Sequence, residues 1–314
     1  MGSLALENSK VAGVLSDHAA IRSGIAAGGR DWIRANKAAI RHAAKAAGRV
    51  VLAECAMRED LGRLPIPTAP TAGPSAALDY PPTPGQFSGR CVAVTSINPN
   101  PARWSRQLQC VESWLRIGLP VITVNTSEEL DRLNLPAGVT GVVCNTLSAI
   151  YDRPTQLITS LSRAGAATGL PTLLINSDIE IHGPVECLET ALQASDKLTI
   201  GVRYNHHAGQ ARPLAVREPS GLDCFLLSPA MLAAIPDAPF AVGKPVWDYW
   251  LPHAVRSQGH KFHWINEPLF FHESHTLGWS HAEWEIGAKV FAKTNDMHLG
   301  YGSRDFRSSL DFNV

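Results

Sequence analysis

The chain has 314 residues, 45% of them hydrophobic, so it can bury the core of one large globular domain or of two smaller ones. Its 28 lysine and arginine residues balance 28 aspartate and glutamate residues, which argues against the net positive field typical of proteins that bind nucleic acids or acidic membranes. The six cysteines are scattered without a CxxC pair, so we expect small buried side chains rather than a disulfide framework or a zinc knuckle.

The sequence carries no targeting signal that we can identify. No stretch is long and apolar enough to span a bilayer, and the first residues lack the charged and apolar regions of a signal peptide. The chain begins Met1-Gly2-Ser3, but Leu6 stands where the myristoylation pattern requires Ser or Thr. We therefore expect a soluble cytoplasmic protein without a membrane span or a lipid anchor.

The N-terminal segment, residues 1–63, is predicted to be helical. Trp32, Ala35 and Ala39 recur on one face of a helix that Asp31 is suited to cap. The following residues, 64–86, contain seven prolines and predict an extended linker or a strap over a surface. We place a domain boundary near residue 86.

Residues 87–314 are predicted to form one α/β domain, because short apolar runs alternate with amphipathic stretches. Strands apolar on both faces are typical of a mainly parallel sheet that helices cover on both sides. In the first half we predict strands at 90–98, 119–125, 139–144 and 171–175, and helices at 105–117, 128–133 and 154–168. In the second half we predict a helix at 184–194, strands at 198–203 and 221–228 with a polar loop at 204–220 between them, a helix from about Val246, and a strand around His263.

Polar side chains follow three of the predicted strands. Asn98, Asn125 and Asp178 each come at the end of an apolar run. Ligands of parallel α/β sheets bind at the carboxyl ends of the strands, so we expect these residues to lie along one edge.

The loop after the first strand lacks the glycine-rich phosphate motifs of dinucleotide-binding proteins and P-loop NTPases. It reads TSINPNPARWSRQ over residues 95–107, and offers hydroxyl, amide, aromatic and guanidinium groups. Such a loop can bond to a nucleotide base and stack on it. Its candidates for nucleotide contact are Thr95, Ile97, Arg103 and Arg106.

Several carboxylates and histidines stand where apolar runs end. The triplet Asn176-Ser177-Asp178 offers hard oxygen ligands suited to Mg²⁺ or Mn²⁺, although an Asx turn explains it equally well. Asp223 lies among apolar residues, a costly position unless its carboxylate is bonded. Five further residues complete the set: Asp248 at a predicted helix start, the flanking Trp247 and Trp250, for which we expect burial in the core, and the strand-ending His272 with His275.

In their order and spacing these motifs resemble the nucleotide-sugar-dependent glycosyltransferases of the GT-A fold. The resemblance rests on VTSINP, VITVN, the NSD triplet, GLDCF and KPVWDYW with a histidine downstream, and covers about residues 88–290. It implies a Rossmann-like, mixed but mainly parallel sheet flanked by helices, a DxD motif that binds a divalent metal and the donor diphosphate, and transfer of a sugar to an acceptor hydroxyl. UDP-sugars are the donors that the resemblance favours.

Position by position, the resemblance implies roles for six residues. Asp178 matches the last aspartate of DxD and is the first choice as metal ligand, with His272 and then His275 completing the metal shell. Asn176 replaces the first aspartate and brings no charge to the metal. Asp248 matches the acceptor base of inverting enzymes, and Asp223 is expected to position donor or acceptor hydroxyls.

Two other functions stay open from the sequence. A nucleotidyltransferase uses a similar sheet and metal, although residues 95–107 lack the basic, glycine-rich loop that it requires. A non-catalytic module that binds nucleotide sugars or a partner protein is the second, since Asn176 lacks the charge of an aspartate. The acceptor is a glycan, a metabolite, a protein or, less in keeping with the balanced charge, DNA. The sequence does not predict the oligomeric state.

Overall fold

The computed structural model describes residues 78–79, 81–153, 155–183, 186–193, 196–275 and 278–294. The helices predicted before residue 63 and most of the proline-rich segment lie outside this range. The described end of that segment contains neither helix nor strand. It is attached to the sheet, because the Asp79 amide donates to the carbonyl of Val143 over 3.1 Å. The domain boundary near residue 86 stays a prediction.

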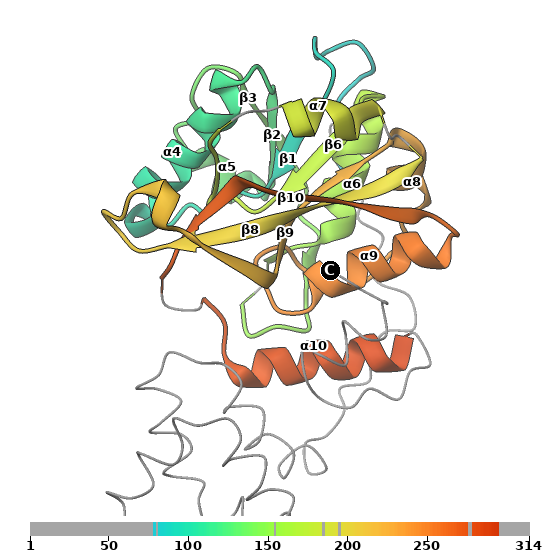
Figure 1. The fold of residues 1–314 in the computed structure, drawn as a ribbon. Helices are drawn as coiled ribbons and strands as arrows, with labels where there is room; N and C mark the ends of the chain where they lie inside the picture. Colours follow the sequence, from blue (N-terminus) through green and yellow to red (C-terminus); the bar gives the residue numbers. More distant parts are fainter. Residues whose placement is uncertain are drawn as a thin grey trace, which may run out of the picture. The chain divides into compact units, whose positions relative to one another are not determined.

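The first half of the sheet is parallel, as the apolar runs predict. Four strands lie side by side in the order β3-β2-β1-β6, with β1 pairing parallel to both β2 and β6 (Figure 1). Every residue of β1, β2 and β6 is buried, which explains why these runs are apolar on both faces. Their bounds are Val92–Thr95 for β1, Val121–Asn125 for β2, Val139–Val143 for β3 and Thr172–Ile175 for β6.

The second half of the sheet is mixed. β9 (Val216–Leu227) pairs antiparallel with β6 and with β8 (Lys197–His206), and β10 (Lys261–Glu273) runs parallel to β8. The edge strand β7 (Ile179–Ile181) is antiparallel to β10. The chain is therefore a mixed α/β protein, consistent with the predicted Rossmann-like class. The polar loop predicted at 204–220 is shorter than expected, because its two ends extend β8 and β9 as a hairpin that closes through the 3₁₀ turn Arg212–Leu214.

Helices cover both faces of the sheet (Figure 1). α4 (Pro101–Arg116) and α7 (Glu186–Gln193) pack on one face, where alternate strand residues such as Ala93 and Leu173 join them in the core. On the opposite face, α6 (Ile158–Thr168) contacts β1, β2 and β6, α8 (Pro229–Ala234) packs on α6, and α9 (Trp247–Ser257) lies against β9. The short α5 (Ser127–Asp131) contacts β3.

Local sequence signals fix where the helices begin. α4 starts four residues before the predicted position 105, because the Asn100 side chain accepts from the Ala102 amide at 3.0 Å and Pro101 occupies the first helical position. α6 starts at Ile158 rather than 154, since β5 (Thr155–Gln156) pairs there with β4 (Leu147–Ser148). None of the helices in the described part of the chain is both long and apolar enough to cross a bilayer.

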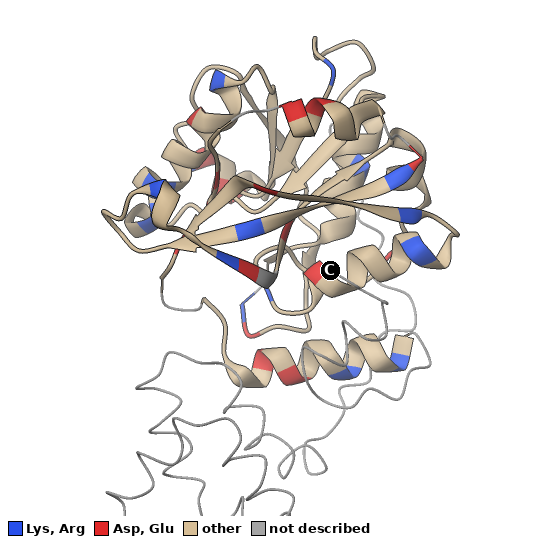
Figure 2. Ribbon diagram, viewed as in Figure 1, with Lys and Arg blue, Asp and Glu red and all other residues tan. Residues whose placement is uncertain are grey.

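Charges of both signs are spread over the elements (Figure 2). In α10 (His281–Thr294) the acidic residues Glu283 and Glu285 lie near the N-terminus, and the basic residues Lys289 and Lys293 lie in the second half. This order complements the helix dipole.

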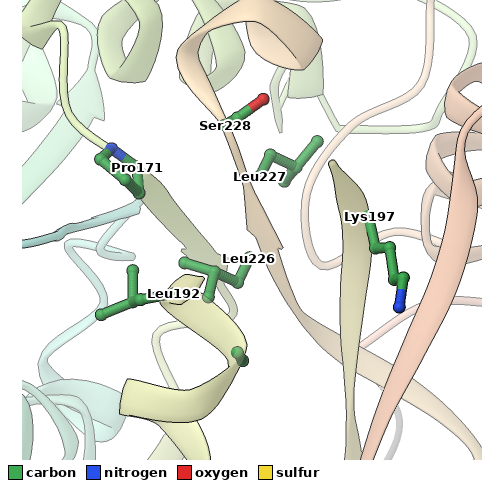
Figure 3. A pocket seen from close by; sticks show the side chains of 7 residues that line it. Pro171, Leu192, Lys197, Leu226, Leu227 and Ser228 are labelled. Carbon is green, nitrogen blue, oxygen red and sulfur yellow. The ribbon is translucent and has the colours of Figure 1, made fainter. Parts of the chain in front are cut away.

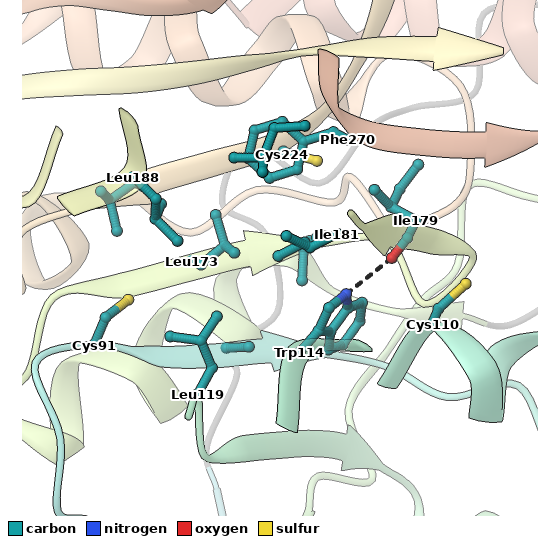
Figure 4. Packing of buried hydrophobic residues seen from close by; sticks show 14 of the residues in the cluster. Cys91, Cys110, Trp114, Leu119, Leu173, Ile179, Ile181, Leu188, Cys224 and Phe270 are labelled. Atoms are coloured by element: carbon teal, nitrogen blue, oxygen red, sulfur yellow. Dashed lines mark hydrogen bonds between the residues drawn. The ribbon is translucent and has the colours of Figure 1, made fainter. Parts of the chain in front are cut away.

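The core between α4 and the sheet centres on Trp114, which is fully buried (Figure 4). Its indole Nε1 donates to the carbonyl of Ile179 over 2.9 Å, and the neighbouring Ser113 Oγ accepts from the Ile181 amide at 3.0 Å. Burial raises the pKa of Cys91, in the same core, to about 12. The five described cysteines form no disulfide with one another, and four of them are buried as predicted.

Gly201 leaves room for the ring of Phe270 across the β8–β10 pair. A Cβ at position 201 would overlap that ring, and both residues are buried. We expect Gly201→Ala to lower the free energy of unfolding by about 1–3 kcal/mol, the usual cost of overpacking a core. Urea denaturation measures the change. Gly209→Asn is the control, since position 209 is open and its φ of 74° suits asparagine; an equal loss in both variants would contradict the packing argument.

Candidate functional site

The carboxyl ends of β1, β2 and β6 meet at one edge of the sheet, as predicted. The buried side chain of Gln107 links two of them. Its Oε1 accepts from the Asn98 amide and from Ser177 Oγ, each over 2.8 Å, and its Nε2 donates to the Asn98 carbonyl over 2.9 Å. The first loop and the NSD triplet are therefore held against each other by one amide.

Asn125 holds the first loop to β2. Its Nδ2 donates to the Ile97 carbonyl over 2.9 Å and to Glu129 Oε2 over 3.0 Å, while its Oδ1 accepts from Thr123 Oγ1 at 2.6 Å. Asn125, Ile97 and Thr95 are each at most 2% exposed. These three side chains serve the packing and bonding of the protein itself, and their contact with a nucleotide stays a prediction.

Asp178, His272 and His275 come together at this edge from segments nearly a hundred residues apart. Asp178 Oδ2 lies 3.1 Å from His275 Nε2 and 3.6 Å from His272 Nε2, and the two nitrogens are 3.2 Å apart. β10 brings His272 beside Asp178, because His272 lies opposite Ile179 in the β7–β10 pair. The Asp178 carboxylate contacts two histidines here rather than only capping a turn.

The spacing of these three atoms suits a metal ion. Ligands bonded at about 2.1 Å are separated by roughly 3.0 Å in octahedral geometry and 3.4 Å in tetrahedral geometry, which brackets most of the observed distances. His272 Nδ1 lies 3.2 Å from Asn205 Oδ1, an oxygen that can accept a hydrogen bond from this nitrogen. In the tautomer that donates from Nδ1 to Asn205, Nε2 of His272 carries the lone pair that metal ligation requires.

The histidines also control the charge of Asp178. Burial alone would raise the pKa of its carboxyl group, but hydrogen bonds and charge interactions with His272 and His275 outweigh burial and lower that pKa well below its ordinary value. Asp178 is consequently ionised at neutral pH, the form that binds cations.

Both carboxylate oxygens of Asp223 have partners, and these interactions offset the desolvation cost of placing the charge among apolar residues. Oδ1 accepts from Asn176 Nδ2 at 2.5 Å, and Oδ2 pairs with the Arg203 guanidinium. Gly221 makes this pair possible, because a Cβ there would overlap that guanidinium. The Asn176 side chain thus has a long-range partner, while its carbonyl accepts from the Ile179 amide in a local turn. An aspartate at position 176 would place two carboxylates next to each other.

Asp248 occupies the first turn of α9 as predicted, with Trp247 and Trp250 buried in the core beside it. Burial, and then the charge of Asp223, raise the pKa of the Asp248 carboxyl well above its ordinary value. Backbone amides of the helix start and Arg203 act in the opposite direction but are outweighed. Asp248 is therefore a stronger proton acceptor than an ordinary aspartate.

The two predicted arginines of the first loop lie in different surroundings. Arg106 Nη1 is 3.8 Å from both Glu180 and Glu273, and no bonding partner for its buried Nε and Nη2 is found among the described residues. Arg103 lies beside Gly278, whose Cβ position would be 3.1 Å from its Nη2. Contact of either arginine with a nucleotide stays a prediction.

Sequence reasoning missed two ion pairs at this edge. Arg203, at the end of the predicted strand 198–203, pairs with Asp223, and Arg212 of the predicted polar loop pairs with Glu180. The missed signal is the strand alternation of Val202-Arg203-Tyr204-Asn205, which continues the apolar run of β8. The register of β8 with β10 places Asn205 beside His272.

A small apolar hollow lies at the opposite end of β6 and β9 (Figure 3). It is lined by Pro171, Leu192, Lys197, Leu226, Leu227 and Ser228, together with Ala191. No acidic or histidine side chain lines it, so the polar edge around Asp178 is the better candidate for chemistry.

The Asp223–Arg203 pair is expected to matter for stability. Asp223→Ala leaves the Arg203 charge, whose side chain is 22% exposed, without this partner, and we expect a loss of about 3 kcal/mol in the free energy of unfolding. Asp237→Ala is the matched control, because it breaks the more exposed pair with Arg163 and should cost less than about 1 kcal/mol. Equal losses in urea denaturation would show that burial of the pair is irrelevant.

Comparison with protein-family models and with curated proteins gives no match to this chain. The fold and the site together define a mixed α/β protein with a candidate metal centre, Asp178-His272-His275, at the carboxyl edge of its sheet.

Proposed function

We propose that the chain is a metal-assisted glycosyltransferase that moves a sugar from a nucleotide diphosphate donor, with UDP-sugars favoured, to an acceptor hydroxyl. One observation carries the proposal: a three-residue candidate metal centre is joined, through Asn176 and Asp223, to a carboxylate with a raised pKa. Asp178 and Asp248 are linked through Asn176 and Asp223, since Asn176 bonds Asp223 and the charge of Asp223 acts on Asp248.

Each group has a distinct task in this reaction. Asp178, His272 and His275 would hold the metal, which would supply positive charge for the diphosphate leaving group. Asp248 accepts the proton of the acceptor hydroxyl as that oxygen attacks the anomeric carbon, which gives inversion of configuration. Asp223, held by Asn176 and Arg203, is fixed in place to bond a sugar hydroxyl.

The ligand set favours Mn²⁺ over Mg²⁺. Two of the three candidate ligands are imidazole nitrogens, whereas Mg²⁺ in proteins prefers oxygen ligands and water. We therefore expect activity with Mn²⁺ to exceed activity with Mg²⁺. A titration of purified protein with Mn²⁺, Mg²⁺, Zn²⁺ and Fe²⁺, followed by calorimetry, ranks the ions directly.

The central experiment offers the purified chain Mn²⁺ and a panel of nucleotide sugars. We expect a metal-dependent rise in melting temperature with one donor and slow release of the nucleoside diphosphate by hydrolysis. A second assay offers a nucleoside triphosphate with a sugar 1-phosphate, and formation of a nucleotide sugar with release of pyrophosphate would identify a nucleotidyltransferase. Binding of a nucleotide sugar without any turnover in the presence of acceptors would identify a binding module. The absence of both a thermal shift and hydrolysis across the panel would refute the proposal.

A further inference from the structure

The turn before α9 contains an unusual backbone conformation. Val246 has φ 80° and ψ −19°, and among the described residues it is the non-glycine residue with a positive φ. A β-branched side chain is strained in this region, and Val246 is also 1% exposed. Strain of this kind persists only where the surroundings impose it, and it gathers at functional sites.

The strained turn determines where Asp248 lies. The Val246 carbonyl accepts from the Tyr249 amide at 3.1 Å and from the Trp250 amide at 2.8 Å, so it starts the first turn of α9. Asp248 belongs to that turn. A different φ at Val246 would redirect this carbonyl and move the Asp248 carboxylate with it.

A buried ion pair ties the turn to α10. Lys244 Nζ lies 2.5 Å from Glu283 Oε1, and the two side chains are only 7% and 4% exposed. Glu283 also caps α10, because its Oε2 accepts from the Ser280 amide at 2.8 Å while its own amide donates to Ser280 Oγ over 3.2 Å. The carboxylate of Glu283 is therefore fixed before it binds Lys244.

Two further contacts hold the same turn. Tyr151 donates its hydroxyl to the Pro245 carbonyl over 2.8 Å. Gly287 of α10 packs on the turn so closely that a Cβ there would lie 3.0 Å from Val246 Cγ2 and 3.2 Å from the Pro245 carbonyl oxygen. The backbone from Lys244 to Val246 is held from several sides, and the ion pair is its one charged link to α10 among the described residues.

We infer that Lys244 and Glu283 are positioning residues, which hold Val246 in its left-handed conformation and so fix the Asp248 carboxylate. The ion pair acts through the backbone and touches no substrate. The catalytic consequence rests on the proposed role of Asp248 as a base, whereas the conformational claim does not.

Hydrogen exchange of the α9 amides tests the conformational claim without any substrate. In Lys244→Met we expect the amides of Tyr249 and Trp250 to exchange at least about tenfold faster, while amides of β1, β2 and β6 keep their rates. Glu283→Gln is the milder second variant, since it keeps an acceptor for Ser280. Arg163→Met is the matched control, because it breaks a different and more exposed ion pair, the one with Asp237.

Substitution of Val246 separates positioning from general stabilisation. Glycine adopts φ 80° freely, so Val246→Gly introduced into Lys244→Met should restore slow exchange at Tyr249 and Trp250. Val246→Ala in the same background should not, because alanine keeps the strain. The inference would be overturned if amide exchange were unchanged in both Lys244→Met and Glu283→Gln, or if exchange accelerated equally throughout the sheet. It would also be overturned if Val246→Ala restored slow exchange as well as Val246→Gly does.

A kinetic measurement connects the pair to catalysis. In a protein that turns over donor, Lys244→Met should lower kcat at least about tenfold with the donor KM unchanged, and Val246→Gly should recover part of the loss. If wild-type protein lacks turnover while the exchange pattern holds, the proposed function fails and the positioning inference stands. If turnover is present and kcat is unaffected, the catalytic part of the inference is wrong.

Discussion

Asp178→Ala is expected to weaken Mn²⁺ binding at least about 100-fold, because loss of a partner outside the metal shell alone costs 10–100-fold. At an ion concentration 100 times the dissociation constant, wild-type protein gains about 2.7 kcal/mol of stability. The variant should gain at most about 0.4 kcal/mol at the same concentration. Thermal unfolding with and without Mn²⁺ measures both gains.

Two further variants show whether Asp178→Ala has lost Mn²⁺ binding or has lost its fold. Asp131→Ala removes an exposed aspartate at the end of α5 and should keep the full Mn²⁺ effect. His272→Ala should weaken binding as well, and its effect should not add to that of Asp178→Ala, since both residues act on one ion. An undiminished Mn²⁺ effect in folded Asp178→Ala would rule out the proposed metal centre.

Asp248→Asn is expected to lower kcat for transfer by about 10²–10⁴, the usual contribution of a general base. The donor dissociation constant should stay within about twofold, because the proposed role of Asp248 concerns the acceptor proton. Steady-state kinetics with an identified acceptor measures the first quantity, and calorimetry with the donor measures the second. If Asp248→Asn retains the wild-type kcat, Asp248 is not the general base of the reaction.

The same substitution has a defined effect on stability against pH. The folded protein raises the pKa of Asp248 above its ordinary value of 3.8, so the folded state holds this proton more tightly than the unfolded state. Stability from this group is complete below the ordinary pKa and is lost as pH rises through the folded pKa. Asp248→Asn should remove that decline and be more stable than wild type at neutral pH, while the two proteins differ little near pH 4.

Much of the sheet follows from the apolar runs, and its mixed second half does not. β1, β2 and β6 are buried on both faces, so their sequences contain little besides apolar residues and threonine. The hairpin ends of β8 and β9 are half-exposed and polar, and their pairing depends on cross-strand partners such as Arg203 with Glu218. Such partners are distant in sequence, and periodicity alone cannot assign them.

At the candidate site, positions at strand ends predicted which residues come together, but not which hydrogen bonds they form. Asp178 follows β6, His272 lies in the last residues of β10 and His275 just beyond it, and these strand ends meet at one edge of the sheet. The bond between Asn176 and Asp223 joins neighbouring strands of opposite direction, so it required the register of β6 with β9. Asn176 lacks the charge of an aspartate, and its amide is what Asp223 requires.

Backbone groups on both edge strands of the sheet, β7 and β3, have hydrogen-bond partners outside the sheet. At β7, the Ile179 carbonyl and the Ile181 amide bond to Trp114 and Ser113 of α4, and at β3 the Val143 carbonyl accepts from Asp79. Unpaired backbone groups on an edge strand recruit strands of other chains. Side chains of α4 and the end of the proline-rich segment thus guard this sheet against aggregation by edge-to-edge pairing.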